Sequence, residues 1–238
     1  MYQFSEMNES AIKIISTRVG YSNSILIVNG SNSIIIDTGV RGYFHHFKTQ
    51  LKQFNLKPTD IKLIILTHTH YDHTGNLKPL AELTGAKVLV HKKEFENLKN
   101  GFIKIPTGQG KYSRLISAVG KAIYPGFASP KPFTADIINE DEFDLKEFGF
   151  EAKIISTPGH SAGSQSVLLG KTLISGDTFV NIRNGIIFPP FANEPNILLE
   201  TWQNLFDLGI EEIYPGHGKP FKVEKAVEEF ERWRMKLK

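Results

Sequence analysis

Short runs of apolar, β-branched residues recur along the chain, most of them closed by glycine, asparagine or proline, and they predict β-strands. The predicted strands cover residues 11–17, 25–28, 33–36, 63–66, 87–90, 153–156, 166–169, 172–175 and 212–214. The sequence VNGSN at 28–32 separates two of them. It predicts a tight hairpin, because Asn-Gly readily adopts the positive φ angles that such turns need.

Stretches with helical spacing lie between these strands. They cover residues 43–54, 76–83, 92–98, 196–208 and 223–235, and Gly85 and Gly209 stand where two of the helices are expected to end. Strands alternate with helices in both halves, without a linker-like segment or a short repeat. The pattern therefore predicts one α/β domain over residues 1–238, with sheets covered by helices.

Composition narrows the possible chemistry. The chain has 238 residues and no cysteine, so we expect neither a disulfide nor a thiolate ligand, and any metal must be held by nitrogen and oxygen. A net charge of +3 is too small to indicate a nucleic-acid partner. The polar N-terminus is unlike a signal peptide, and no apolar run approaches a membrane span. We therefore expect a cytoplasmic protein.

Histidine and aspartate side chains follow the predicted strands. The stretch LTHTHYDHTG at 66–75 places three histidines and an aspartate directly after an apolar run. Further along the chain, single residues stand one to four positions past a strand end and close to a glycine: Asp37, His160, Asp177 and His217. Because the loops at strand ends of layered α/β folds meet at one edge, we expect these side chains to converge on one site.

Imidazoles and carboxylates in this number predict a metal site. One tetrahedral ion needs three protein ligands and an open position, so seven ligands suit two ions that share a carboxylate. The seven are His68, His70, Asp72, His73, His160, Asp177 and His217. Extended backbone turns His68 and His70 to one side. Three other histidines match no position of this pattern and are expected to be ordinary: His45, His46 and His91.

At these residues the sequence resembles the metallo-β-lactamase-fold hydrolase superfamily, whose signature is H-x-H-x-D-H followed by a lone His, a bridging Asp and a final His. The resemblance spans about residues 12–220. It implies a four-layer αββα sandwich of two facing mixed β-sheets covered by helices. It implies a first metal ion held by His68, His70 and His160, and a second held by Asp72, His73 and His217, with Asp177 as the bridge.

Asp37 matches the family's aspartate that accepts the remaining N–H of a ligand histidine. The alternative is that Asp37 only caps the turn before Gly39.

Two divalent ions predict hydrolysis. We expect zinc first, with iron or manganese as alternatives, because nitrogen and oxygen ligands accept all three. A metal-bridging hydroxide would attack a carbonyl or phosphorus centre, and Asp72 or Asp177 would pass a proton to the leaving group.

Comparison with named branches of the family narrows the substrate. Asp177 and the absence of cysteine argue against a true β-lactamase. Glyoxalase II carries a helical C-terminal domain for glutathione, whereas this chain continues for about 20 residues beyond His217. Lactonases that open acyl-homoserine lactones share the full ligand set. We therefore expect a hydrolase of a small ester, thioester or lactone.

Three alternatives stay open beside this expectation. The first is a mononuclear iron enzyme of the persulfide dioxygenase type, and the second is a phosphodiesterase or RNase of the same fold. The third is a metal-binding module without catalysis. The sequence leaves the oligomeric state open.

Residues 101–135 form an expected insertion that carries lysine, arginine and aromatic residues but no acidic residue. We predict a lid that meets an anionic small-molecule substrate with an apolar part, with Lys111 and Arg114 as contacts. The alternative is a helical insertion that packs on the core and leaves its lysines solvated. In the apolar loop 186–195, Phe188 and Phe191 are candidate substrate contacts, unless this proline-rich loop simply packs.

Overall fold

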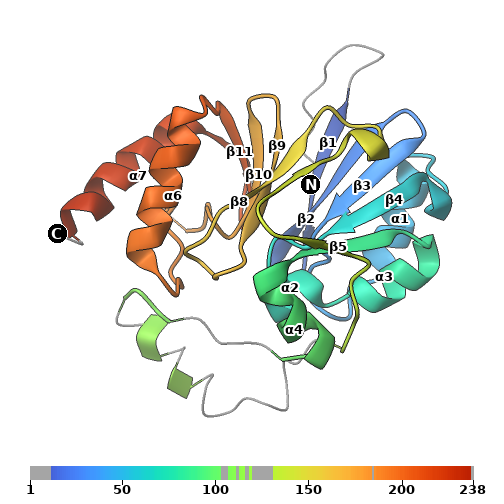
Figure 1. The fold of residues 1–238 in the computed structure, drawn as a ribbon, viewed down its shortest axis with the longest axis horizontal. Helices are drawn as coiled ribbons and strands as arrows, with labels where there is room; N and C mark the ends of the chain where they lie inside the picture. The colour runs from blue at the N-terminus through green and yellow to red at the C-terminus, as the bar shows by residue number, and fades with distance from the viewer. Residues whose placement is uncertain are drawn as a thin grey trace.

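The computed structural model describes residues 12–102, 107–110, 113–115, 118–119, 131–183 and 185–236. Two six-stranded sheets lie side by side in the middle of the molecule, with helices on both outer sides (Figure 1). The strand order is β1-β2-β3-β4-β5-β6 in the first sheet and β12-β11-β10-β9-β8-β7 in the second. The expected αββα sandwich of two mixed sheets is confirmed.

The first sheet joins an antiparallel half to a parallel half. Its antiparallel strands are β1 (Lys13–Val19), β2 (Ser22–Asn29) and β3 (Asn32–Ile36). Its parallel additions are β4 (Ile61–Ile65), β5 (Lys87–His91) and β6 (Ile137–Asn139). The helices of this half are α1 (His45–Gln53), α2 (Tyr71–Thr74), α3 (Leu77–Thr84) and α4 (Lys92–Asn100), with a 3₁₀ turn at Pro58–Asp60. The hairpin expected at 28–32 is present, because Asn29 pairs with Asn32. The positive φ of the turn lies at Gly30, with 58°, and not at Asn29.

The second sheet is antiparallel except for the pair β10–β11. Its strands are β7 (Glu142–Asp144), β8 (Lys153–Ser156), β9 (Gln165–Leu169), β10 (Thr172–Gly176), β11 (Glu212–Pro215) and β12 (Phe221–Lys222). A 3₁₀ turn lies at Lys146–Phe148. Helix α6 (Pro195–Asp207) connects the parallel pair, and α7 (Val223–Lys236) packs beside α6.

The apolar strands are explained by burial on both faces. Ile34 and Ile36 of β3 point into the core between the sheets, whereas Ile35 points to the helix-covered face. β4 repeats the pattern, with Leu63 inside and Ile64 toward the helices. Helices α1, α3 and α4 cover the first sheet, and α6 and α7 cover the second.

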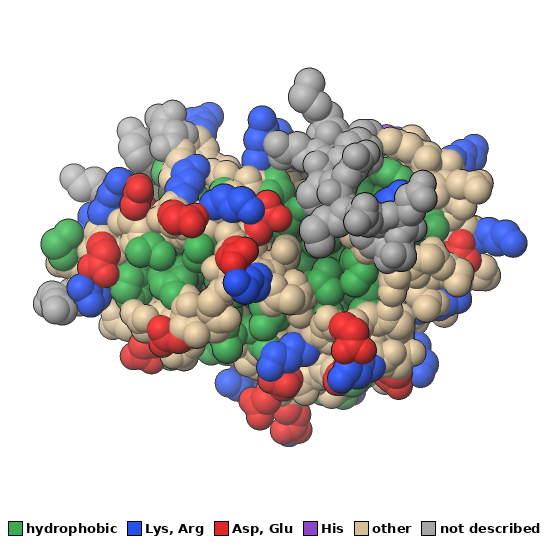
Figure 2. All heavy atoms as spheres, turned by 90° about the horizontal axis from the view of Figure 1, so that it is seen from above, with side chains coloured by type: hydrophobic (Ala, Val, Ile, Leu, Met, Phe, Trp, Pro, Cys, Tyr) green, Lys and Arg blue, Asp and Glu red, His purple; other side chains and the backbone are tan. Residues whose placement is uncertain are grey.

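Surface charge is mixed on the end of the sandwich at the top of Figure 1. Figure 2 views that end and shows acidic and basic side chains interspersed between green hydrophobic patches, with almost no histidine. Among the described residues, no helix is both long enough and apolar enough to cross a membrane.

Candidate metal centre

The H-x-H-x-D-H residues lie in the loop and short helix that follow β4. His68 lies in the loop after β4, and His70 has extended backbone. Helix α2 begins directly after His70, so that Asp72 and His73 occupy one helical turn. The backbone N–H of His73 donates to the carbonyl of His70 at 2.9 Å. This tight turn folds the four side chains back toward the end of the strand.

The second half supplies three further side chains. His160 lies in the loop after β8, Asp177 follows the last residue of β10, and His217 follows β11. Gly216 allows the loop after β11 to approach Asp177 closely, because a Cβ at position 216 would lie 2.1 Å from Oδ1 of Asp177. The structure thus brings all seven sequence-predicted ligand candidates together.

Among the described residues, potential ligand atoms form three groups of three, each within 4.8 Å of one another. One of them, Asp37, His68 and His73, overlaps with the other two. Those other two share no residue, and they are His68, His70 and His160 as the first group, and Asp72, His73 and His217 as the second. The first and the second group each take two residues from the loop after β4 and one from the second half of the chain. Neither group can form until the two halves of the sandwich have docked.

Asp177 faces both groups. Its Oδ2 lies 3.7 Å from Nε2 of His160 and 3.3 Å from Nε2 of His217, and its Oδ1 lies 3.3 Å from Nε2 of His73. A carboxylate in this position can serve two cations at once.

The outer ring nitrogens of the histidines have fixed partners. Nδ1 of His160 lies 2.8 Å from the carbonyl of Phe191, and Nδ1 of His217 lies 2.8 Å from the carbonyl of Tyr21. A carbonyl only accepts, so both rings carry a proton on Nδ1, and each ring presents a lone pair on Nε2 when it is neutral. Such contacts orient metal-binding histidines.

Asp37 plays the same part for His73. Its Oδ2 accepts from Nδ1 of His73 at 2.7 Å and from the hydroxyl of Thr67 at 2.7 Å, while its Oδ1 accepts from the Thr67 backbone N–H at 2.8 Å. Asp37 is 2% exposed and has a φ of 59°, an uncommon value for a residue other than glycine. Both oxygens are occupied by donors, so Asp37 is better placed to orient His73 than to bind an ion itself.

Buried atoms without a hydrogen bond show that a cation fits here. Among the described residues, four buried side-chain atoms lack a hydrogen-bond partner, and three of them are Nε2 of His68, Nε2 of His73 and Oδ1 of Asp177. Leaving buried polar atoms unsatisfied is costly. Nitrogen and carboxylate oxygen are ligand types that zinc, iron and manganese accept. A divalent ion in each group would satisfy these atoms.

The charges of the site divide the histidines into two kinds. Burial lowers the pKa of His68 well below its usual range and that of His160 to about 4. For His73 and His217, burial is outweighed by nearby carboxylates, Asp177 above all, and the pKa is raised. Those two imidazoles in turn hold the pKa of Asp177 well below its usual range, against the effect of burial.

Two tyrosines border the second group and were missed by the sequence analysis. The hydroxyl groups of Tyr21 and Tyr71 lie 2.5 Å apart, and the ring of Tyr21 is stacked on His217 with 6.3 Å between centroids. Burial raises the pKa of both tyrosines. Both remain partly exposed, so their hydroxyls can reach a ligand. The only sequence signal was that Tyr71 lies inside the H-x-H-x-D-H motif.

The residues expected to contact the substrate differ in how far they are exposed. Phe188 is 1% exposed and packs on Trp202 and Trp233, so it belongs to the core and has no surface to offer a substrate. The proline-rich loop turns this ring inward. Phe191 is half-buried, and Arg114 is exposed. Lys111 lies outside the described residues.

Part of the expected insertion is attached next to His160. Thr107 accepts a hydrogen bond from the backbone N–H of Ala192 at 3.0 Å, and the backbone N–H of Gln109 donates to Pro190 at 2.8 Å. The side-chain amide of Gln109 donates to the carbonyl of Ala192 at 2.6 Å. Residues 107–110 therefore lie against the strand-like segment whose Phe191 carbonyl contacts His160.

The three remaining histidines lie outside the two groups. His91 accepts from the backbone N–H of Lys93 and so caps α4. His45 and His46 stand at the start of α1, with their rings 4.4 Å apart.

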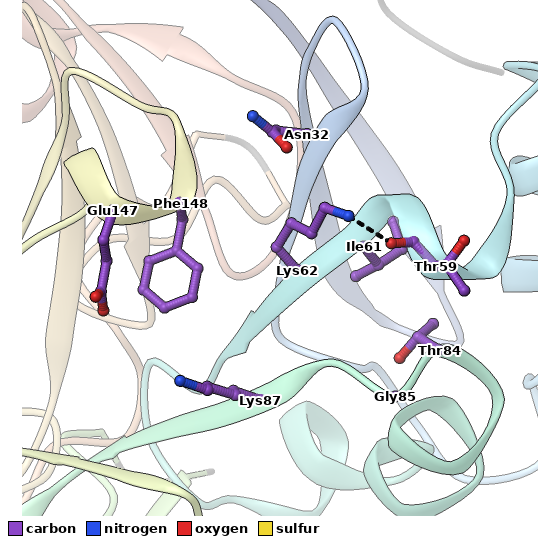
Figure 3. A pocket seen from close by; sticks show the side chains of 9 residues that line it. All are labelled: Asn32, Thr59, Ile61, Lys62, Thr84, Gly85, Lys87, Glu147 and Phe148. Atoms are coloured by element: carbon purple, nitrogen blue, oxygen red, sulfur yellow. Dashed lines mark hydrogen bonds between the residues drawn. The ribbon is translucent and has the colours of Figure 1, made fainter.

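A separate hollow of about 610 Å³ lies at the opposite ends of the strands. It is lined by Asn32, Thr59, Ile61, Lys62, Thr84, Gly85, Lys87, Glu147 and Phe148. Figure 3 shows Lys62 turned toward Thr59, to whose carbonyl its ammonium group donates at 2.8 Å. Ile61 and Lys87 begin β4 and β5, whereas His68 follows the end of β4. The hollow is therefore not part of the histidine cluster.

Known proteins are similar to this chain in sequence. The family model described as Metallo-beta-lactamase superfamily matches residues 17–217. The probable metallo-hydrolase MJ0888 of Methanocaldococcus jannaschii is 32% identical over 216 residues, which cover 84% of this chain and 89% of that protein. A hydroxyacylglutathione hydrolase of Shewanella pealeana is 27% identical over 146 residues, covering 61% of this chain and 41% of that protein.

Solved structures share the fold. An archaeal metallo-beta-lactamase superfamily protein from Sulfolobus tokodaii, ST1585, superposes with a TM-score of 0.63 at 25% identity, covering 89% of this chain and 80% of that one. The protein TTHA1623, solved in a di-iron-bound form, superposes with a TM-score of 0.61 at 24% identity, covering 87% of this chain and 92% of that one.

Proposed function

This chain belongs to the metallo-beta-lactamase superfamily and is a metallo-hydrolase, and from this premise we propose that it binds two divalent ions and hydrolyses a small ester, thioester or lactone. The observation that carries the proposal is the pair of ligand groups with Asp177 between them. Zinc is the first choice for both ions. Iron is the alternative, and the di-iron form of TTHA1623 supports it.

The proposed roles follow the two groups. His68, His70 and His160 would hold the first ion, and Asp72, His73 and His217 would hold the second. Asp177, whose oxygens face histidines of both groups, would be shared. Asp37 keeps the proton of His73 on Nδ1, so that Nε2 offers its lone pair. Divalent ions bound here lower the pKa of water and stabilise negative charge that develops on the substrate.

The carboxylates of the site have a second role in the proposal. Oδ2 of Asp72 lies 3.4 Å from Nε2 of His217, and the side chain of Asp72 is 12% exposed. Asp72 or Asp177 can hold the proton taken from water and deliver it to the leaving group. No cysteine or serine nucleophile is needed for this chemistry.

Substrate class is inferred from one relative and from exposed side chains of the expected insertion and of the loop after Asp177. The relative named hydroxyacylglutathione hydrolase supports an acyl bond as the one that is cleaved. Phe102, Leu115 and Ile186 are exposed apolar side chains of the expected insertion and of the loop after Asp177. They favour a substrate with an apolar part, and the exposed Arg114 favours an anionic group. The expected insertion would then border the substrate.

The test is metal content followed by a substrate screen. Protein purified without chelators should contain two ions per chain by plasma mass spectrometry, and His70→Ala should lose one of them. His45→Ala is the matched control and should keep both. The loaded protein should cleave at least one member of a panel of lactones, thioesters and esters, whereas the chelated protein should not.

Other outcomes would replace the proposal. One iron per chain with oxygen uptake on a persulfide would establish the dioxygenase reaction instead. Cleavage confined to phosphodiesters, with RNA binding that weakens steeply with salt, would establish a nuclease. Two ions without any turnover across the panel would leave a metal-binding module.

A further inference from the structure

Glu94 is a buried carboxylate on the helix next to the histidine cluster. It is the third residue of α4 and is 5% exposed. Among the residues that the structure describes, no lysine or arginine forms an ion pair with it. A buried carboxylate without a cationic partner is rare, because burial removes the water that stabilises its charge. The contacts that Glu94 does make are therefore informative.

Two hydroxyl groups compensate this charge, one on each oxygen. Thr69 donates to Oε2, and Ser161 donates to Oε1 at 2.7 Å. Thr69 stands between His68 and His70, and Ser161 follows His160. One carboxylate thus connects the two separate segments that supply the first ligand group.

The loop after His160 is shaped to reach this carboxylate. A Cβ at Gly163 would lie 2.6 Å from Cγ of Glu94 and 3.1 Å from Nδ1 of His91, so no side chain fits there. Ser164 holds the loop from the other side, with its hydroxyl 2.9 Å from that of Ser161. The contact between loop and helix is consequently close and well defined.

We propose that Glu94 is a positioning residue that sets the affinity for the first metal ion, by fixing His70 and His160 relative to each other through Thr69 and Ser161. The inference rests on the proposed metal-binding function. Among the described residues, no hydrogen bond links Glu94 to Asp72, His73 or His217, so the second ion should depend on it much less. Asp37 contacts His73 of the second group directly and reaches His68 of the first group only through the hydroxyl of Thr67.

The experiment measures metal affinity in metal-stripped protein. Zinc is titrated against a chromogenic chelator in the wild type and in Glu94→Ala, Glu94→Gln and Glu96→Ala, the last being an exposed glutamate of the same helix. His70→Ala and His217→Ala identify which binding step belongs to which group. The d–d absorption of bound Co²⁺ reports the ligand geometry without relying on catalysis.

We expect Glu94→Ala to weaken the first ion about 10–100-fold and to change its Co²⁺ spectrum. Glu94→Gln should restore most of the affinity, because its amide can accept from one hydroxyl and donate to the other. Glu96→Ala should match the wild type. If metal-free Glu94→Ala does not fold by circular dichroism, the variant Thr69→Val with Ser161→Ala carries the same test.

The inference is overturned if Glu94→Ala binds both ions like the wild type, if both ions weaken equally, or if glutamine rescues nothing. A wild-type protein that binds fewer than two ions would instead refute the proposed function. That result overturns this inference as well. The metal content of the wild type therefore shows whether the proposed function has failed, and the variants show whether this inference alone has failed.

Discussion

Replacing Asp37 by asparagine exchanges one carboxylate oxygen for an amide nitrogen where three donors converge. If the amide oxygen stays on the backbone N–H of Thr67, the NH₂ group faces Nδ1 of His73. That nitrogen must then accept rather than donate. The opposite rotamer opposes the NH₂ group to the Thr67 N–H, and two donors cannot bond. The substitution therefore favours His73 with its proton on Nε2.

The expected loss of metal affinity follows from the position of the proton on His73. Nε2 of His73 is the atom turned toward Asp177, and a proton on it removes the lone pair that an ion would need. Changes to such orienting contacts typically cost 10–100-fold in metal affinity, or about 1.4–2.8 kcal/mol. Global stability should fall by only about 1 kcal/mol, because most hydrogen bonds keep a partner.

Competition titration with zinc checks the Asp37→Asn prediction. The second ion should weaken more than the first, because Asp37 contacts His73 directly and reaches His68 only through the hydroxyl of Thr67. The exposed Asp207→Asn should leave both ions unchanged. Equal weakening of both ions would show that Asp37 supports the whole cluster rather than His73. Unchanged affinity for the second ion would refute the reasoning from the histidine tautomer.

Three further substitutions test the surroundings of the site. Phe188→Ala removes a buried ring that stacks on Trp233 at 4.0 Å, and urea unfolding should show a loss of about 3–5 kcal/mol. Asn23→Ala leaves two carbonyls in the loop around His217 without their donor, so unfolding should show a loss of about 1–3 kcal/mol and calorimetry a weaker second ion. In the wild type, Tyr71 accepts a hydrogen bond from Tyr21 and can donate its own hydroxyl proton to a substrate. Tyr71→Phe removes this donor and should raise KM several-fold with kcat nearly unchanged; unchanged steady-state kinetics would exclude Tyr71 as a substrate contact.

The fold was largely predictable because its strands are buried on both faces and its helices are long enough to show their spacing. The parts that escaped prediction are short. β12 has two residues and β7 reads Glu-Phe-Asp, so neither offers a hydrophobic period. Their pairing is decided by the neighbouring strand rather than by their own sequence.

The site was predictable only where the residue type announces the chemistry. Histidine after a strand end is conspicuous, whereas Asn23 is an ordinary amide whose carbonyl partners lie 192 and 195 residues away. Phe188 failed for a related reason, since nothing in a proline-rich loop tells which way a ring turns. Glu94 did carry a signal, because it precedes the buried Leu98 by four residues and so places a charge on the apolar face of α4.

The origin of each ligand group in two parts of the chain orders the events of biogenesis. His68 and His217 are 149 residues apart (217 − 68), which takes on the order of ten seconds to synthesise at roughly 5–20 residues per second. During that interval the nascent H-x-H-x-D-H loop offers an incomplete coordination shell, from which any ion escapes readily. Residue 160 completes the first group and residue 217 the second. Metal selectivity is thus set only after the two halves have docked, by the ligand geometry of the folded protein and not by the free loop.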